Sequence, residues 1–415
     1  MLRTMLNNFQ TLRPPVKAMV YLFWIYVFVS SLTGLFVQLF VYSTFQSIAV
    51  NVIALAVDFF GIMLGFCVVG AIFAKWSLNL KWGYVFSFVF MAASFGFLYG
   101  SVSRLDAMLF MLAHGIGSGI YWLTIHTFEL TETKNDEREF YSSMLSFGGQ
   151  LIGVVAPIIG TTLLYFSEKL FHGQTFTLLF VIAPITYLAG LPFFRKISDY
   201  RPKPITKTDV KHFFTDRRNR FSQLYLFGDS LTMTWETALI PVASLLLLHD
   251  VKHVGIFNSV FAILSVFILV FISRFRHSGN RMLFLAATAL PMSFLAGLPV
   301  LSFSLAVFIV YTIGMMILGP LSRTARHVID LETMETLAHK ESDFFPTMIF
   351  RDFSLWVWRV IGSLLILLII GIVSSEEKAV RFGFGLLVFS PMIMLLGAFF
   401  MYKAFRRHHE VDPQG

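Results

Sequence analysis

Long apolar stretches alternate with short charged ones along the whole chain. Twelve stretches are apolar over about 20 residues or more, the length at which an α-helix crosses a bilayer. Their approximate bounds are 17–42, 48–73, 82–102, 105–129, 140–166, 174–194, 221–248, 253–273, 281–302, 304–325, 349–373 and 380–403. Because a helix satisfies its own backbone hydrogen bonds in lipid, the pattern predicts an all-α membrane protein with twelve transmembrane helices.

The polar segments between these stretches differ in length. The shortest, 302–304, separates the ninth and tenth stretches, and the longest, 195–220, separates the sixth and seventh. The long segment contains Arg201-Pro202-Lys203-Pro204, which resists helix formation, and then 209–220, which could lie as a basic amphipathic helix on the membrane surface. We expect an N-terminal six-helix bundle at 1–194, a basic cytoplasmic linker at 195–220 and a C-terminal six-helix bundle at 221–415.

Two short patterns occur once in each half of the chain. The pattern HTFEL at 126–130 returns as HVIDL at 327–331, 201 positions later, and REF at 138–140 returns as RDF at 351–353, 213 positions later. Both offsets are close to half of the 415 residues, and the copies keep their order. This indicates an internal duplication, which predicts two pseudo-symmetric bundles.

Composition agrees with a membrane location. Hydrophobic residues make up 56% of the chain and charged residues only 13%, against about 25% charged in soluble domains. The single cysteine, Cys67, lies within an apolar stretch, so no disulfide framework is expected. The sequence has no phosphate-binding glycine loop, no metal-site spacing and no cluster of catalytic residues. We expect no cofactor and no enzymatic activity.

The basic residues predict the orientation. Of the 32 Lys and Arg residues, 26 fall in segments on the side of the two termini, five fall on the opposite side, and Arg359 lies inside a stretch. Positive charge favours the cytoplasmic side, so both termini are expected in the cytoplasm and the protein in the plasma (inner) membrane. The net charge of +8 thus reflects topology, and nucleic acid is not an expected partner.

The stretch from Gly119-Ile-Tyr-Trp122 through Glu129 to Arg138 resembles the fourth span, loop and fifth span of bacterial members of the major facilitator superfamily. Pro157-Ile-Ile-Gly160 resembles part of the glycine-proline motif in their fifth helix. The resemblance implies a secondary active transporter that moves a small solute by alternating access, with proton coupling expected, in the lipid bilayer and as a monomer.

Two loops depart from the pattern of that family. Between the second and third spans, Gly70 and Lys75 fit the family's signature loop, but Ala74 stands where an Asp is usual. Between the eighth and ninth spans, Arg274 fits and Ser273 replaces the Asp. Import and export therefore both stay open. A lipid or lipid-linked substrate flippase, or a receptor-like relative that does not transport, is the alternative function.

Charged residues inside the predicted spans are the first candidates for a substrate or proton site, because each is costly there unless paired or hydrated. Asp58, Glu236 and Arg359 fall near the middle of their spans, and Asp229 lies seven residues before Glu236 on the same helix face. The resemblance implies that Asp58 and Glu236 approach Arg359 and that Glu236 faces a central cavity and carries the coupled proton. A buried structural ion pair is the alternative.

A polar stripe runs along the stretch 105–129. Its members recur at steps of three or four residues, so they share one helix face. They are His114, Ser118, Trp122, His126 and Glu129. The stripe is a second candidate for substrate contact, with an interhelical hydrogen-bonding face as the alternative, and Gln150 is a further polar candidate.

The repeated patterns lie where two helices of each half meet a cytoplasmic loop. Acids and bases at these places can pair when the cytoplasmic side is closed, so we expect them to form cytoplasmic gates. The candidates are Glu129, Arg138, Lys75, Arg274, Asp330, Arg351 and Asp352.

Overall fold

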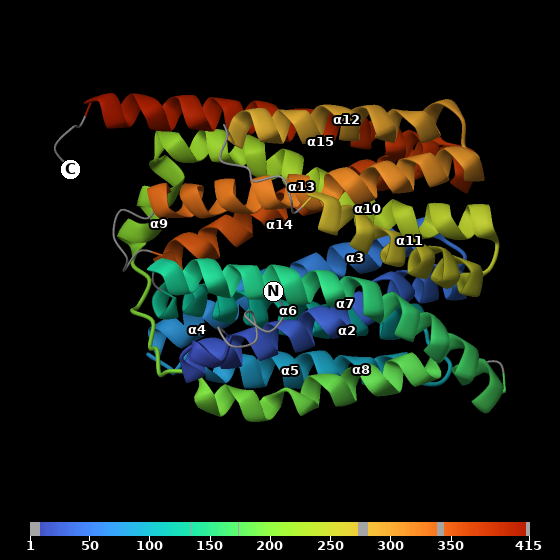
Figure 1. The fold of residues 1–415 in the computed structure, drawn as a ribbon, viewed down its shortest axis with the longest axis horizontal. Helices are drawn as coiled ribbons and strands as arrows, with labels where there is room; N and C mark the ends of the chain where they lie inside the picture. The colour runs from blue at the N-terminus through green and yellow to red at the C-terminus, as the bar shows by residue number, and fades with distance from the viewer. Residues whose placement is uncertain (1–8, 134, 173, 273–280, 338–343, 412–415) are drawn as a thin grey trace. The chain divides into compact units, whose positions relative to one another are not determined.

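The computed structural model describes residues 9–133, 135–172, 174–272, 281–337 and 344–411. These residues form helices and connecting turns and contain no strand, as Figure 1 shows. The all-α expectation is therefore confirmed for the described part of the chain.

The helices follow the apolar stretches in order. In the first half they are α2 (Pro14–Phe45), α3 (Ile48–Met63), α4 (Gly70–Lys75), α5 (Trp82–Ser94), α6 (Arg104–Glu132), α7 (Asn135–Leu170) and α8 (Thr177–Ala189). A π-helical segment, Leu64–Val69, joins α3 to α4. In the second half they are α9 (Lys207–Thr215), α10 (Arg217–Leu248), α11 (Val251–Ile272), α12 (Arg281–Leu301), α13 (Leu305–Leu337), α14 (Phe344–Ile372) and α15 (Glu376–Val411).

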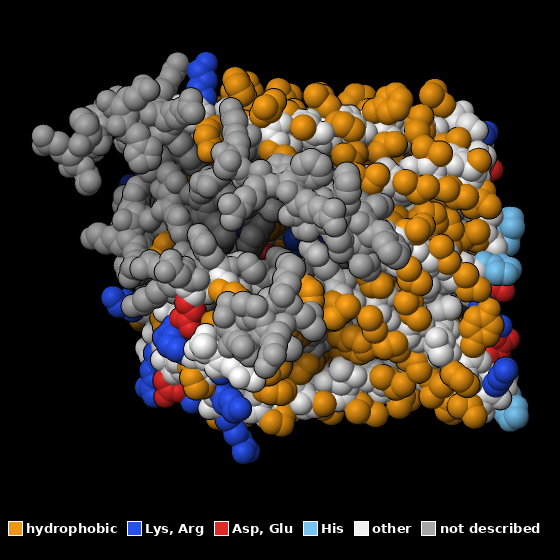
Figure 2. Space-filling view, viewed as in Figure 1, with side chains coloured by type: hydrophobic (Ala, Val, Ile, Leu, Met, Phe, Trp, Pro, Cys, Tyr) orange, Lys and Arg blue, Asp and Glu red, His pale blue; other side chains and the backbone are white. Residues whose placement is uncertain are grey.

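Ten helices in the described residues are long and apolar enough to cross a membrane. Two shorter apolar helices, Trp82–Leu98 and Val251–Ser265, occupy the places of the third and eighth predicted spans. Twelve crossings therefore stay a prediction. Figure 2 shows hydrophobic side chains covering the sides of the helices, while most of the visible charged and histidine side chains lie near helix ends.

Several helices are longer than the apolar stretches that predicted them. The tenth stretch was expected to end at residue 325, but α13 continues to Leu337. Hydrophobicity marks the part of a helix that lipid surrounds, and a helix can continue past it into water. The prediction of one surface helix over 209–220 was wrong, because α9 ends at Thr215 and the residues from Arg217 onward belong to α10.

The chain divides into two compact units. Unit 1 comprises residues 1–40 and 57–204, and unit 2 comprises residues 41–56 and 205–415. The main division falls between Pro204 and Ile205, inside the segment expected to be a linker.

In unit 1, glycines let α6 approach α3 and the π-helical segment closely. A Cβ atom added at Gly115 would collide with the carbonyl oxygen of Asp58, and one at Gly119 with that of Ile62. Close backbone approach between small residues stabilises helix pairs in lipid through van der Waals packing. This contact brings Asp58 beside the predicted polar stripe.

The end of unit 1 is anchored to the start of α5. The backbone N–H of Leu80 donates to the carbonyl of Tyr200 over 2.8 Å, and Lys81 Nζ lies 2.5 Å from Asp199 Oδ1. The hydrogen bond from Lys81, with a second from Asn79, holds the pKa of the Asp199 carboxyl below its ordinary value.

In unit 2, α10 packs along α15, and α12 packs against both α13 and α15. The backbones of α10 and α15 touch, because a Cβ atom at Gly228 would collide with the backbone of Met394, and one at Gly397 with that of Tyr225. Around this contact lies an apolar core that includes Leu285, Ile329, Leu355 and Met401. The packing places the polar face of α10 opposite α13.

Candidate functional site

Asp58 contacts His114, which is the member of the polar stripe closest to the start of α6. His114 Nδ1 lies 3.1 Å from Asp58 Oδ1, and the imidazole stacks on Phe110 with ring centroids 5.5 Å apart. The sequence prediction paired Asp58 with Arg359, whereas its ionic partner within unit 1 is His114. A pairing with Arg359, which belongs to unit 2, stays a prediction.

Trp122 is held on two sides. Its indole Nε1 donates a hydrogen bond to the hydroxyl of Tyr26 over 2.9 Å, and its ring stacks on His126 at a centroid distance of 5.1 Å. Tyr26 in turn stacks on Tyr121 at 3.9 Å. The stripe expected on one face of α6 therefore includes an aromatic surface in which the indole N–H of Trp122 is bound by a neighbour.

Glu129 ends the stripe with two partners from its own unit. Its Oε2 lies 2.9 Å from His126 Nδ1, and its Oε1 accepts a hydrogen bond from the Tyr141 hydroxyl over 3.1 Å. The expectation of a basic loop partner gains no support from these contacts. Lys75 is exposed and lies 5.8 Å over the ring of Trp76.

Two of the proposed gate residues lie outside the described part of the structure. These are the side chain of Arg138 and all of Arg274. A basic contact that the sequence analysis missed lies nearby, because Arg13 binds Glu137, with Nη2 2.8 Å from Oε2. That hydrogen bond raises the pKa of Arg13 above its ordinary value. It ties the start of α2 to the start of α7.

In unit 2, Asp229 on α10 pairs with Arg326 on α13. Arg326 Nη1 lies 2.5 Å from Asp229 Oδ1, and both side chains are about four-fifths buried, with 17% and 20% of their surfaces exposed. The Tyr225 hydroxyl also donates to the carbonyl of Arg326 over 3.3 Å. The sequence analysis counted Arg326 as a loop residue. That was wrong, because α13 continues past it and brings it opposite α10.

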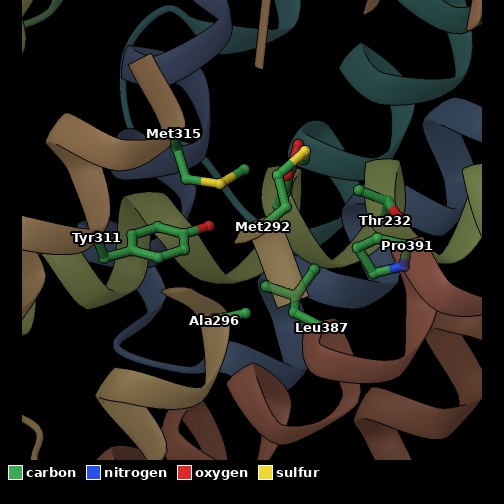
Figure 3. Close-up of a pocket in the computed structure, with 8 residues that line it drawn as sticks. Thr232, Met292, Ala296, Tyr311, Met315, Leu387 and Pro391 are labelled. Carbon is green, nitrogen blue, oxygen red and sulfur yellow. The ribbon is translucent and has the colours of Figure 1, made fainter. Parts of the chain in front are cut away.

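Glu236 lies near the middle of α10 and lines a small pocket. Four helices of unit 2 form the pocket (Figure 3), with Thr232 and Glu236 from α10, Met292 and Ala296 from α12, Tyr311 and Met315 from α13, and Leu387 and Pro391 from α15. The resemblance implied that Glu236 faces a central cavity, whereas this pocket lies inside its own unit.

The carboxylate of Glu236 makes no hydrogen bond and no ion pair with the described residues. The charges close enough to act on it are those of Arg326, Arg323 and Asp229. The predicted neighbour, Arg359, is buried on α14 and directs Nη2 to the sulfur of Met233, 3.4 Å away. The cations that act on Glu236 thus include Arg323 and Arg326 of α13.

The second gate pattern is ordered by an ion pair. Arg351 Nη2 on α14 lies 2.6 Å from Asp330 Oδ2 on α13, which is one of the pairings expected from the sequence. Asp352, the next residue on α14, is buried. The contact is present, and its role as a gate stays a prediction.

A second stripe lies on α13, and sequence reasoning missed it. Shifting the members of the α6 stripe by the repeat offset of 201 gives Met315, Gly319, Arg323 and Asp330 as the counterparts of His114, Ser118, Trp122 and Glu129. Adding Tyr311, one turn earlier, completes what we call the α13 stripe. The repeat offset was therefore sufficient to find Arg323.

The last candidate, Gln150, contributes little to either arrangement. Its side chain is exposed on α7 and makes no hydrogen bond to the part of the chain that the structure describes. The polar groups that the fold brings together are those of the α6 stripe in unit 1 and of α10, α13 and α14 in unit 2.

No protein-family model matches the sequence, and no curated protein matches it significantly. Solved structures do resemble it. The human organic anion transporter MFSD10 (TETRAN) aligns at a TM-score of 0.63 and 13% identity, covering 92% of this chain and 99% of that one. The nucleoside transporter NupG aligns at a TM-score of 0.62 and 11% identity, covering 93% and 99%. A single-substitution variant of NupG gives 0.65 and 12%, covering 94% and 100%.

At these identities the likeness concerns the fold. The chain has the fold of major facilitator superfamily transporters, which is the fold that the sequence resemblance implied. Together with the apolar helices, this makes it a multi-pass membrane protein.

Proposed function

We propose that the protein is a secondary active transporter that moves a small solute by alternating access and couples that movement to protons through Glu236. In this proposal two six-helix bundles, with both termini in the cytoplasm, work as a monomer in the plasma membrane. The observation that carries the proposal is the carboxylate of Glu236, which lines a pocket inside an apolar helix bundle without a partner among the described residues.

A carboxylate in such surroundings takes up a proton or pairs with a cation, because transfer out of water disfavours its charged form. Arg323 and Arg326 are close enough to act on Glu236, but neither forms an ion pair with it, and Arg326 is bound to Asp229. Glu236 can therefore exchange a proton without breaking a contact. A group that gains and loses a proton while the pocket changes its access is what proton coupling requires.

The fold supports the transport part of the proposal. The similar structures belong to transporters of organic anions and of nucleosides, and both kinds of solute are small organic molecules. Ion pairs at Asp229–Arg326 and at Asp330–Arg351 supply contacts between helices that can form and break when a bundle changes state.

The test uses purified protein in liposomes that enclose a pH-sensitive dye. A panel of small organic acids, bases and nucleosides is added outside, and internal pH and solute uptake are both followed. We expect at least one solute to move together with protons in the parent protein. In Glu236→Gln the same solute should exchange across the membrane without moving protons.

The matched control is Glu377→Gln, which removes an exposed acid at the start of α15 and should behave like the parent. Proton movement in Glu236→Gln equal to that of the parent would exclude Glu236 as the coupling site. Absence of any solute uptake, with scrambling of a fluorescent lipid instead, would reject solute transport in favour of lipid flipping.

A further inference from the structure

We propose that Arg323 binds an anionic group of the transported solute, so that the substrate is an organic anion bearing a carboxylate, phosphate or sulfonate. This inference rests on the proposed transport function and assigns it a substrate class. It comes from the position, exposure and contacts of the guanidinium on α13.

Arg323 lies on the α13 stripe at the same place that Trp122 has on the α6 stripe. Its side chain leans back by one turn over Gly319, because a Cβ atom added to that glycine would lie 4.0 Å from Arg323 Nη2. The side chain is exposed, and no hydrogen bond or ion pair joins it to the described residues. The guanidinium thus stands open on the surface of the helix.

The depth of Arg323 follows from two contacts between α10 and α13. Asp229 meets Arg326, whereas Glu236, seven residues further along α10, shares a pocket with Tyr311 and Met315, which come earlier on α13. The two helices therefore run antiparallel. A side chain that leans from Arg323 toward Gly319 lies between the level of Asp229 and that of Glu236, well inside the apolar part of α10.

Other arginines of unit 2 have contacts that occupy them. Arg326 binds Asp229, Arg351 binds Asp330, and Arg381 donates to the carbonyl of Val300. An arginine inside a span is costly unless it is paired or faces water. A guanidinium held open at this depth, without a protein anion, is suited to receive an anion from a solute.

The chemistry of the guanidinium defines the ligand. Arginine keeps its charge at any physiological pH and presents a planar fork of donors that matches the two oxygens of a carboxylate, phosphate or sulfonate. The charge of Arg326 acts on Arg323 as well, which adds to the attraction for an anion. Neutral and cationic solutes gain nothing from either group.

Glu236 links this site to the proposed proton. Its charge acts on Arg323, so its ionised form competes electrostatically with an incoming anion and its protonated form does not. The other ionisable groups near Glu236 are Arg326, Asp229 and Tyr311, and the pocket residues from α12 and α15 are not ionisable. Proton and anion therefore favour each other's binding, as thermodynamic linkage requires.

The test measures thermal unfolding of the purified, detergent-solubilised protein with matched solutes. Each set has an acid, its amide and its amine on one carbon skeleton, such as benzoate, benzamide and benzylamine, together with phenyl phosphate, benzenesulfonate and nucleoside monophosphates. Inorganic phosphate and phosphatidylglycerol are separate arms. We expect stabilisation by organic anions only.

Arg323→Gln should weaken the binding of those anions by about tenfold to a hundredfold, the value of a hydrogen bond to a charged group. Arg323→Lys should retain part of the affinity for those anions. Arg220→Gln removes an exposed arginine at the inner end of α10 and should match the parent. Glu236→Gln should still bind anions, so a failure of proton coupling and a failure of anion recognition can be told apart.

Three results would overturn the assignment. The stabilising solutes could be neutral or cationic, the organic anions could stabilise Arg323→Gln as well as the parent, or no soluble organic anion could stabilise the parent at all. Stabilisation by phosphatidylglycerol alone, even if it depended on Arg323, would belong to the last case and point to a lipid headgroup.

Discussion

The α6 stripe of unit 1 and the α13 stripe of unit 2 occupy corresponding positions in the two halves of the chain. They differ in whether their polar side chains have hydrogen-bond or ionic partners. On α6 the polar side chains of the stripe have hydrogen-bond partners, as Asp58 binds His114, Tyr26 binds Trp122 and Tyr141 binds Glu129. On α13 the stripe carries an arginine, Arg323, that has no such neighbour among the described residues.

The difference shows how a duplicated helix can keep its geometry while its chemistry diverges. Residues three or four positions apart share one face of a helix, so each stripe lies on a single face. Packing of the neighbouring helices maintains this geometry. The identity of the side chains at that face is free to change. Unit 1 uses aromatic rings and hydrogen bonds, which produce a rigid surface, and unit 2 uses charges, which produce a surface that responds to ions and protons.

The largest effect on stability is expected from the charge pair of unit 2. Arg326→Gln removes one member of a partly buried pair and leaves Asp229 uncompensated, which should lower the stability of the protein by about 3 kcal/mol. Adding Asp229→Asn should restore most of the loss. Thermal unfolding of the two single variants and the double variant gives the coupling energy, and additive losses would show that the two residues do not depend on each other.

Replacing the corresponding acids of the two gate patterns should lower the stability of the protein by different amounts. Asp330→Asn loses a hydrogen bond to the charged Arg351, worth about 1.5–3 kcal/mol, whereas Glu129→Gln weakens bonds to Tyr141 and His126, worth about 1 kcal/mol. If these acids hold the cytoplasmic side closed, both variants should also increase the labelling of engineered cysteines from the cytoplasm. Unchanged labelling in both would reject the gate while leaving the stability difference intact.

The aromatic surface of unit 1 can be tested by Tyr26→Phe. The change removes the hydroxyl that accepts the hydrogen bond of Trp122 and keeps the ring stacked on Tyr121, so it should cost about 1 kcal/mol. Tryptophan fluorescence should also change as the indole N–H of Trp122 loses its partner. A variant as stable as the parent, with unchanged emission, would show that the hydrogen bond does not hold Trp122.

The smallest effect concerns Asp199, which is exposed and bound by Lys81. Its pKa is lower in the folded protein than in the unfolded chain, so its contribution is complete above the unfolded value of about 3.9 and is lost as pH falls through the folded value. Asp199→Asn should lower the unfolding temperature slightly at pH 7 and not at pH 2. A difference that persists at pH 2 would point to a cause other than the carboxylate charge.

Much of this architecture can be predicted from the order of apolar and polar residues. Helix formation in lipid depends on the length and hydrophobicity of each stretch, and both can be read from the chain. The boundary expected at 302–304 agrees with the structure, since α12 ends at Leu301 and α13 begins at Leu305. Helix ends were harder, because charged residues such as Arg326 mark the limit of the apolar stretch but do not stop the helix.

The candidate site was predictable in part. Glu236 and Asp229 stood out because charges in apolar stretches are rare, and the α6 stripe followed from helical spacing alone. Their partners were not predictable. Arg326 faces Asp229 and His114 meets Asp58, because partners depend on which helices pack together and at what register.

The sequence by itself determined that this chain forms apolar helices in a repeated order, since local hydrophobicity and spacing set those properties. The tertiary structure alone decided which charged side chains have an ionic partner among the described residues and which do not. Asp229 and Arg326 are 97 residues apart in the chain, and only the packing of α10 against α13 brings them together. The same packing leaves the carboxylate of Glu236 in a pocket and the guanidinium of Arg323 exposed beside Gly319.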